Sequence, residues 1–337
     1  MLKKNLKLLV ALVALAIIAT ILILKNSSST LKKELSDFAI KDTASIDKFF
    51  IADKSGNKVL LERKNNFEWT LNGKYKARPD VVNNFLSVIC KLQVNAPVAK
   101  AAFNNIVKQL ATSGIKVEVY SKGQNIKTFY VGGGNQFNTG TYMIIENSTT
   151  PFAVTIPGFE GYLTPNFSSH ETVWRATTVF DYNYNEISKL DFSFITNPEN
   201  SFSIEKKNEN GLNKVALTIA NKPIAVFDTA IVNEYLLQFK NLNYEAVSDK
   251  VRATRKDSAL QMPLFKVDIL SVSGEKRTAT FYRKPVDKGT LDNAGNPTDY
   301  DIERLFTIIN GNTNEMIVTQ YYVFDKIIKT GPSFLKK

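Results

Sequence analysis

The sequence predicts an α+β protein in which a single N-terminal transmembrane helix is followed by two tandem α+β modules, mostly of antiparallel sheets with flanking helices. Residues 8–24 are apolar apart from Thr20. Short segments with period-two alternation are interrupted by segments with helical periodicity. The same order of segments returns about 150 residues later. We therefore expect an anchor and spacer in residues 1–30, a first module in residues 31–171 and a second in residues 172–337.

Residues 8–24 are long enough to cross most of a bilayer. At about 1.5 Å per residue a helix of this length spans roughly 25 Å, and the flanking Lys7 and Lys25 can extend toward the interfaces. A cleaved signal peptide is the alternative, but its apolar region normally has about 7–15 residues and ends at small residues. Lys25 and Asn26 follow here instead. We therefore expect an uncleaved anchor.

The orientation of this anchor follows from its short N-terminal tail. Three lysines precede the segment and three follow it closely, so the positive-inside rule gives little preference. A short tail normally remains in the cytoplasm, which sends residues 26–337 across the membrane. We expect a single-pass protein of the bacterial inner membrane, with its body in the periplasm and the lipid bilayer as the partner of residues 8–24.

Periodicity predicts the elements of the first module. Pro79 at a helix start and Asp80 in the first turn predict a helix over residues 81–92, and a second is expected over residues 99–110, ending at Gly114. Alternating segments bounded by turn residues predict strands at residues 46–53, 57–64, 67–73, 115–121, 125–132, 141–147 and 151–157.

The second module repeats the first with little identity. Residues 81–86 match residues 231–236 in pattern, and residues 115–119 match residues 265–269, both at a shift of 150. We also align Ile46-Asp47 with Leu190-Asp191 and Val154-Thr155 with Val318-Thr319. This order indicates a tandem duplication with a joint near residues 172–189 in which each copy has its own core.

The chain resembles the family known as domain of unknown function 4340. The residues that carry the resemblance are Asp42-Thr43-Ala44-Ser45-Ile46-Asp47, Leu60-Leu61-Glu62-Arg63, Trp69-Thr70-Leu71, the helix over residues 81–92, Ser113-Gly114-Ile115, Tyr130-Val131-Gly132, Thr141-Tyr142-Met143, Phe152-Ala153-Val154 and Trp174-Arg175. The resemblance implies a single-pass envelope protein of Bacteroidetes-type bacteria with an extracytoplasmic body. Some relatives are joined to, or are neighbours of, auxiliary components of ABC transporters linked to gliding motility. The family supplies no catalytic residues.

Charge and composition disfavour several functions. The net charge is +11, but the lysines are dispersed and no basic cluster is present, so we expect no nucleic-acid partner. Cys90 is the single cysteine and His170 the single histidine, which leaves one possible Cys–His pairing and no intrachain disulfide. Gly132-Gly133-Gly134 follows a strand but precedes no helix, so we expect a hairpin loop rather than a phosphate loop. We predict no enzyme activity and no cofactor.

Two sets of candidate site residues remain. The acidic loop that contains Asp292, Asp299 and Asp301 offers oxygen ligands to a cation, but it lacks the alternate spacing and closing Glu of a calcium loop, so a solvated loop is our preferred interpretation. Asp-Thr/Ser-Ala sites make Thr43, Thr229 and Ser258 candidates for bacterial O-glycosylation; alternatively, Asp228 before Thr229 caps the following helix. Glu118 and Asp268 lie at equivalent strand positions, where we expect solvent-facing side chains.

These patterns predict a non-enzymatic, membrane-anchored periplasmic protein. It would act as a scaffold or accessory component of an envelope transport or motility assembly, with an envelope protein as its partner. A periplasmic carbohydrate- or lipid-binding module is the alternative, favoured if exposed Tyr182 and Tyr184 line a groove. An undetected hydrolase is the second alternative.

Overall fold

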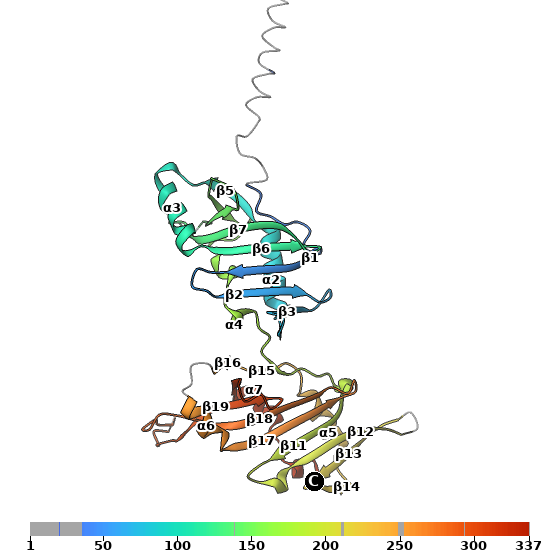
Figure 1. Cartoon of the computed structure of the whole chain (residues 1–337). Coiled ribbons are helices and arrows are strands. Elements are labelled where there is room, and N and C mark those ends of the chain that lie inside the picture. The colour runs from blue at the N-terminus through green and yellow to red at the C-terminus, as the bar shows by residue number, and fades with distance from the viewer. Residues whose placement is uncertain are drawn as a thin grey trace, which may run out of the picture. The chain divides into compact units, whose positions relative to one another are not determined.

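The computed structural model describes Thr20 and residues 36–137, 139–209, 212–248, 253–292 and 294–336 (Figure 1). The chain divides into two compact units between Ala176 and Thr177. Each is described by itself below, as unit 1 and unit 2. Within the described residues, none of the helices has the length and apolar character needed to cross a membrane. Apart from Thr20, the predicted anchor lies outside the described residues.

Unit 1 is built on a nine-stranded antiparallel sheet with the strand order β4-β3-β2-β1-β6-β7-β8-β9-β5. Its strands are β1 (Ile46–Ala52), β2 (Lys58–Arg63), β3 (Trp69–Leu71), β4 (Tyr75–Lys76), β5 (Gln93–Pro97), β6 (Ile115–Ser121), β7 (Gln124–Gly134), β8 (Thr141–Ile145) and β9 (Phe152–Thr155). Its helices are α2 (Pro79–Lys91), α3 (Lys100–Ser113), η2 (Thr164–Phe167) and α4 (Glu171–Trp174). Alternation predicted most of these strands, and Pro79 begins α2 as expected.

One face of this sheet is covered by α2. Alternate residues of the strands, such as Phe49 in β1 and Val119 in β6, are fully buried against Val82 and Phe85 of the helix. The opposite face of strands β1, β2 and β6 is uncovered in Figure 1. Because side chains alternate between the two faces of a strand, the residues between the buried ones form this open face.

Unit 2 has the same strand order, β14-β13-β12-β11-β17-β18-β19-β20-β16. These strands are β11 (Ile187–Phe194), β12 (Phe202–Glu209), β13 (Leu212–Ile219), β14 (Lys222–Ile224), β16 (Ala246–Val247), β17 (Pro263–Ser271), β18 (Lys276–Pro285), β19 (Tyr300–Ile309) and β20 (Met316–Gln320). Strands β10 (Thr178–Phe180) and β15 (Leu242–Asn243) form a separate pair. The helices are η3 (Tyr184–Glu186), η4 (Pro198–Asn200), α5 (Thr229–Leu237), α6 (Ala253–Leu260), α7 (Tyr321–Phe324), η5 (Asp325–Ile327) and η6 (Gly331–Phe334). The shared order is what a duplicated α+β module predicts.

Strand register corrects part of the repeat alignment. Phe49 pairs with Val119 in unit 1 and Leu190 pairs with Ile269 in unit 2, so Phe49 corresponds to Leu190. In both units the register shifts at the start of the first strand, between Ile46 and Lys48 in unit 1 and between Ile187 and Lys189 in unit 2. Ile46 therefore corresponds to Ile187, and the alignment of Ile46 with Leu190 was wrong.

The alignment of the last strands was wrong by one residue. Tyr142 pairs with Ala153 in unit 1, and Phe306 pairs with Val318 at the matching place in unit 2. Val154 therefore corresponds to Thr319. Apolar-acid and Val-Thr pairs recur by chance in alternating segments, whereas backbone pairing fixes one register.

Candidate functional site

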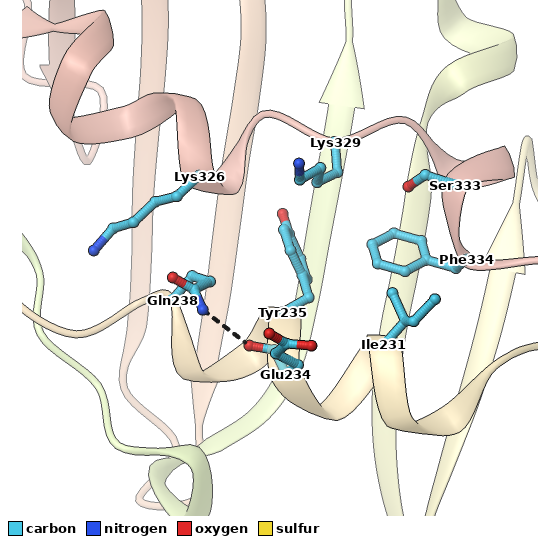
Figure 2. Close-up of a pocket in the computed structure, with 8 residues that line it drawn as sticks. All are labelled: Ile231, Glu234, Tyr235, Gln238, Lys326, Lys329, Ser333 and Phe334. Atoms are coloured by element: carbon cyan, nitrogen blue, oxygen red, sulfur yellow. Dashed lines mark hydrogen bonds between the residues drawn. The ribbon is translucent and has the colours of Figure 1, made fainter.

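A pocket of about 410 Å³ lies in unit 2 between α5 and the segment that contains η5 and η6 (Figure 2). Helix α5 with its C-cap Gln238 supplies four of the lining residues and the C-terminal segment the other four, which together are Ile231, Glu234, Tyr235, Gln238, Lys326, Lys329, Ser333 and Phe334. The volume lies toward the lower end of the roughly 300–1,000 Å³ that small-molecule sites occupy. The pocket therefore suits a small ligand.

Tyr235 and Phe334 form the base of the pocket. Their rings meet edge to face with centroids 5.1 Å apart, and both side chains are almost fully buried. The Tyr235 hydroxyl donates a hydrogen bond of 2.8 Å to the carbonyl of Ile327, and burial raises the pKa of Tyr235 well above its usual value. The base is therefore fixed, and its hydroxyl remains protonated at neutral pH.

The helix that supplies half of the pocket begins with a side-chain cap. The Asp228 carboxylate accepts hydrogen bonds from the amides of Ala230 at 2.9 Å and Ile231 at 3.2 Å. Such a cap satisfies amides that have no partner within the helix and favours helix initiation at this residue. The expected capping role of Asp228 is confirmed. The cap holds the first turn of α5, which contains the pocket residue Ile231.

Charged and polar side chains form the rim of the pocket. Glu234 comes from α5 and Gln238 is its C-cap, and Lys326 and Lys329 come from the opposite segment. In Figure 2 the Lys329 ammonium and the Ser333 hydroxyl point into the space above the two rings. No ion pair joins either lysine to Glu234 in the part of the chain that the structure describes. The rim therefore carries two ammonium groups and one carboxylate; the Lys329 ammonium points into the space above the rings, and the Lys326 ammonium points away from it.

Backbone hydrogen bonds identify the residues of unit 1 that correspond to the pocket of unit 2. The amide of Arg78, which precedes α2, donates to the Trp174 carbonyl at 2.7 Å. The amide of Asp228, which precedes α5, donates to the Phe334 carbonyl at 2.9 Å. Trp174 therefore corresponds to Phe334, and the short helices α4 and η6 to each other. The repeat continues to this point, which sequence patterns did not reveal.

This place is closed in unit 1. The Asn84 amide donates a hydrogen bond of 2.9 Å to the side-chain oxygen of Asn166. Trp174 is fully buried, with its ring centroid 5.4 Å from that of Phe85. Because η2 ends seven residues before Trp174 and η5 ends seven residues before Phe334, Asn166 corresponds to Lys326.

The structure does not bring the acidic loop residues together. Asp292 accepts hydrogen bonds from the amides of Ala294 at 2.9 Å and Asn296 at 2.8 Å, which lower its pKa. Asp301 forms an ion pair of 2.6 Å with Lys284. Asp299 contributes its carbonyl to a hydrogen bond from the Val286 amide. Among the described residues there is no group of three or more His, Cys, Asp or Glu side chains placed to hold a metal.

The three candidate glycosylation sites differ in accessibility. Thr229, the first residue of α5, and Ser258 in α6 are exposed. Thr43 is half-buried, and its carbonyl accepts a hydrogen bond of 3.0 Å from Arg63. An oligosaccharide would therefore meet less obstruction at Thr229 and Ser258 than at Thr43.

The three glycines do not form the expected hairpin loop. They are the last residues of β7, and α3 crosses this strand. A Cβ atom on Gly132 would lie 2.9 Å from Leu110 Cδ2 and 3.1 Å from the Tyr142 carbonyl. A side chain is thus excluded by the close approach of α3, which periodicity does not show.

The structure shows how far four polar side chains singled out in the sequence are buried. Glu118 is half-buried and Asp268 is buried, because Lys116 pairs with the first at 2.5 Å and Lys266 with the second at 2.8 Å. Both lie on the face of their strand opposite the core, as alternation predicted, but their lysine partners leave little of either side chain exposed. Tyr182 and Tyr184 are half-buried against the core of unit 2, so neither has the full exposure that the carbohydrate-binding alternative assumed. Tyr184 also donates a hydrogen bond of 3.0 Å to Asn233.

The lone cysteine and histidine are placed on separate elements. Cys90 is half-buried on α2, where its carbonyl accepts a hydrogen bond of 2.9 Å from the Lys41 ammonium. His170 is exposed at the start of α4. The Cys90 carbonyl therefore joins the segment before β1 to α2.

Comparison with known proteins identifies one family. The family described as "Domain of unknown function (DUF4340)" matches residues 69–263, more than half of the chain, from β3 of unit 1 to the beginning of β17 in unit 2. No curated protein and no solved structure matches the chain.

Proposed function

We propose that this chain, which belongs to the DUF4340 family, binds a protein partner in the cell envelope. Residues 8–24 would hold it in the inner membrane with its body in the periplasm, and it would serve as a scaffold or accessory component of a transport or motility assembly. The duplicated module supports this proposal, because two copies of one sheet offer two similar binding faces on a single chain.

The open face of the unit 1 sheet is the observation that carries the proposal. The Lys48 ammonium lies 4.3 Å from the centroid of the Tyr120 ring, and the Tyr120 hydroxyl donates to Glu118 at 2.6 Å. Lys116 completes this group through its ion pair with Glu118. Aromatic and charged side chains that are already fixed lose little conformational entropy when a partner docks. This face therefore suits protein recognition.

A site-specific crosslinking experiment tests the proposal. A photo-crosslinking amino acid at Leu60, on the open face, is compared with the same group at Asn83, which is exposed on α2. In intact membranes we expect a defined protein adduct from position 60 and not from position 83. Equal adducts at both positions, or none at position 60, would contradict the proposal.

The pocket of unit 2 favours a second candidate function, which is binding of a small carbohydrate. Its rim combines hydrogen-bond acceptors on Glu234 and Gln238 with donors on Lys329 and Ser333. Sugars carry several hydroxyl groups that both donate and accept hydrogen bonds. A periplasmic carbohydrate-binding role is compatible with partner binding, because the open face and the pocket use different residues.

A further inference from the structure

We infer that the pocket of unit 2 binds a small saccharide that carries a carboxylate. This inference deepens the second candidate function and does not depend on a protein partner. It rests on a comparison of the pocket with the corresponding place in unit 1, where the same backbone framework is closed by different side chains.

The rim of the pocket differs from its counterpart at the positions that control access. The hydrogen-bonded pair Asn84 and Asn166 of unit 1 is replaced by Glu234 and Lys326. These two longer side chains form no ion pair with each other, so no contact between them closes the rim in the described part of unit 2. The replacement removes the short Asn84–Asn166 hydrogen bond and leaves two charged groups at the rim that do not pair with each other.

The remaining positions change in the same direction. The buried Val88 corresponds to Gln238, and Ser169, whose hydroxyl donates to Asp53 at 2.7 Å, corresponds to Lys329. Trp174 is replaced by the smaller Phe334. Unit 2 therefore has less aromatic volume at the base and more polar groups at the rim.

The charge of the rim selects an anionic ligand. The rim carries two ammonium groups, on Lys326 and Lys329, and one carboxylate, on Glu234, whereas Lys266 and Lys284 on the sheet are neutralised in ion pairs with Asp268 and Asp301. A ligand carboxylate placed near Lys329 and Ser333 would gain charge-assisted hydrogen bonds, which are stronger than neutral ones.

Hydrogen-bond acceptors on the other side of the pocket select hydroxyl groups. The Glu234 carboxylate only accepts hydrogen bonds, and the Gln238 side chain can accept through its oxygen. A simple anion would leave these acceptors to water. A sugar acid supplies a carboxylate and several hydroxyl donors within one small molecule, so it matches both sides of the pocket.

Ligand binding to the full chain in lipid nanodiscs tests this inference. D-glucuronate is the probe, D-glucose lacks the carboxylate, and acetate lacks the hydroxyl groups; binding is measured by saturation-transfer NMR. We expect glucuronate to bind more tightly than either control. Equal binding of acetate, equal binding of glucose, or no binding of glucuronate would each overturn the inference.

Rim variants then assign the binding to this pocket. The double variant E234N/K326N introduces the asparagine pair of unit 1, and we expect it to weaken glucuronate binding about tenfold or more, because charged hydrogen bonds are lost. The reciprocal variant N84E/N166K is the matched control and should leave binding unchanged. An unchanged affinity in E234N/K326N would overturn the inference.

Two further measurements keep the variant result interpretable. Circular dichroism verifies that E234N/K326N is folded, and the single exposed substitution K329Q should also weaken glucuronate binding if the pocket is the site. Crosslinking from position 60 should be unaffected by these variants. Loss of saccharide binding is thereby distinguished from failure of the protein-partner proposal.

Discussion

Lys127 of unit 1 and Arg277 of unit 2 occupy the same position on equivalent strands, and both hold the segment that leads into their sheet. Lys127 donates to the carbonyls of Asp37 at 2.6 Å and Ala39 at 2.8 Å. Arg277 donates to the carbonyls of Val179 and Thr178 at 3.1 and 2.9 Å. Burial lowers the pKa of both cations. The two units therefore share contacts that position the main chain.

The units differ in where their cores place aromatic side chains. In unit 2 four phenylalanines form a row on neighbouring strands, with nearly parallel rings and centroids 4.5 to 5.4 Å apart: Phe202, Phe192, Phe265 and Phe281. The corresponding residues of unit 1 are aliphatic: Val59, Ile51, Ile115 and Val131. Unit 1 instead places Trp69 and Trp174 around Phe49. One backbone topology thus accepts two distributions of aromatic volume.

Truncation within the phenylalanine row is expected to have the largest effect. Phe265→Ala should destabilise unit 2 by about 3–5 kcal/mol, because a buried ring is removed. Ile115→Ala, at the same position of unit 1, should cost less because Ile115 is half-buried. Both tryptophans lie in unit 1, so tryptophan fluorescence during urea unfolding reports unit 1 and circular dichroism reports both units. A larger loss in the Ile115 variant would contradict this account of the cores.

The glycines under α3 provide the next test. Gly132→Ala should destabilise unit 1 by about 1–3 kcal/mol, since the added methyl group meets Leu110 and a carbonyl. Gly133→Ala is the matched control, because its nearest neighbour is the flexible end of Gln109 at 3.0 Å. Urea unfolding followed by tryptophan fluorescence should separate the two variants. Equal stability would show that α3 can shift without cost.

Loss of the α5 cap should have a smaller effect. Asp228→Ala is expected to cost about 1 kcal/mol, because the first-turn amides lose their acceptor. Arg78 holds the same position before α2, but that helix has no side-chain cap and begins with Pro79. Arg78→Ala should therefore change stability only by the roughly 0.2–1 kcal/mol that is usual for an exposed ion pair. Thermal unfolding of both variants makes the comparison, and a larger cost for Arg78→Ala would contradict it.

A further expected effect depends on pH. Burial lowers the pKa of Lys206 to about 8, whereas Arg63 occupies the same position in unit 1 and stays protonated. Between about pH 8 and pH 10.5 the unfolded chain would bind more protons at Lys206 than the folded chain, so this group makes stability rise with pH. Lys206→Arg should remove that part of the rise. Identical pH profiles of urea unfolding would refute the assignment.

Regular elements were predictable from the sequence, but their short connections were not. Alternation located β1, β2 and β6, and Pro79 marked the start of α2, because these elements bury one face of a periodic pattern. The edge strand β5 was missed, since most of its residues are exposed and show no alternation.

The pocket was missed for a related reason. Half of its lining comes from η5, η6 and the residues between them, which are too short to show periodicity. The sequence does contain one signal: each copy ends with an aromatic residue after a short polar segment, Trp174 in the first copy and Phe334 in the second. Aligning these two residues places Asn166 opposite Lys326 and shows the change at the rim.

The attachment of the leading segment has a mechanical consequence. The chain on the N-terminal side of unit 1 is connected to the sheet through the Lys127 ammonium and the carbonyls of Asp37 and Ala39, in addition to the covalent backbone. A pulling force applied before Ser36 would act on these hydrogen bonds to β7 before it reached the first residue of β1. Tension would then reach β7 as well as β1, two strands that are separated in the sheet by β6.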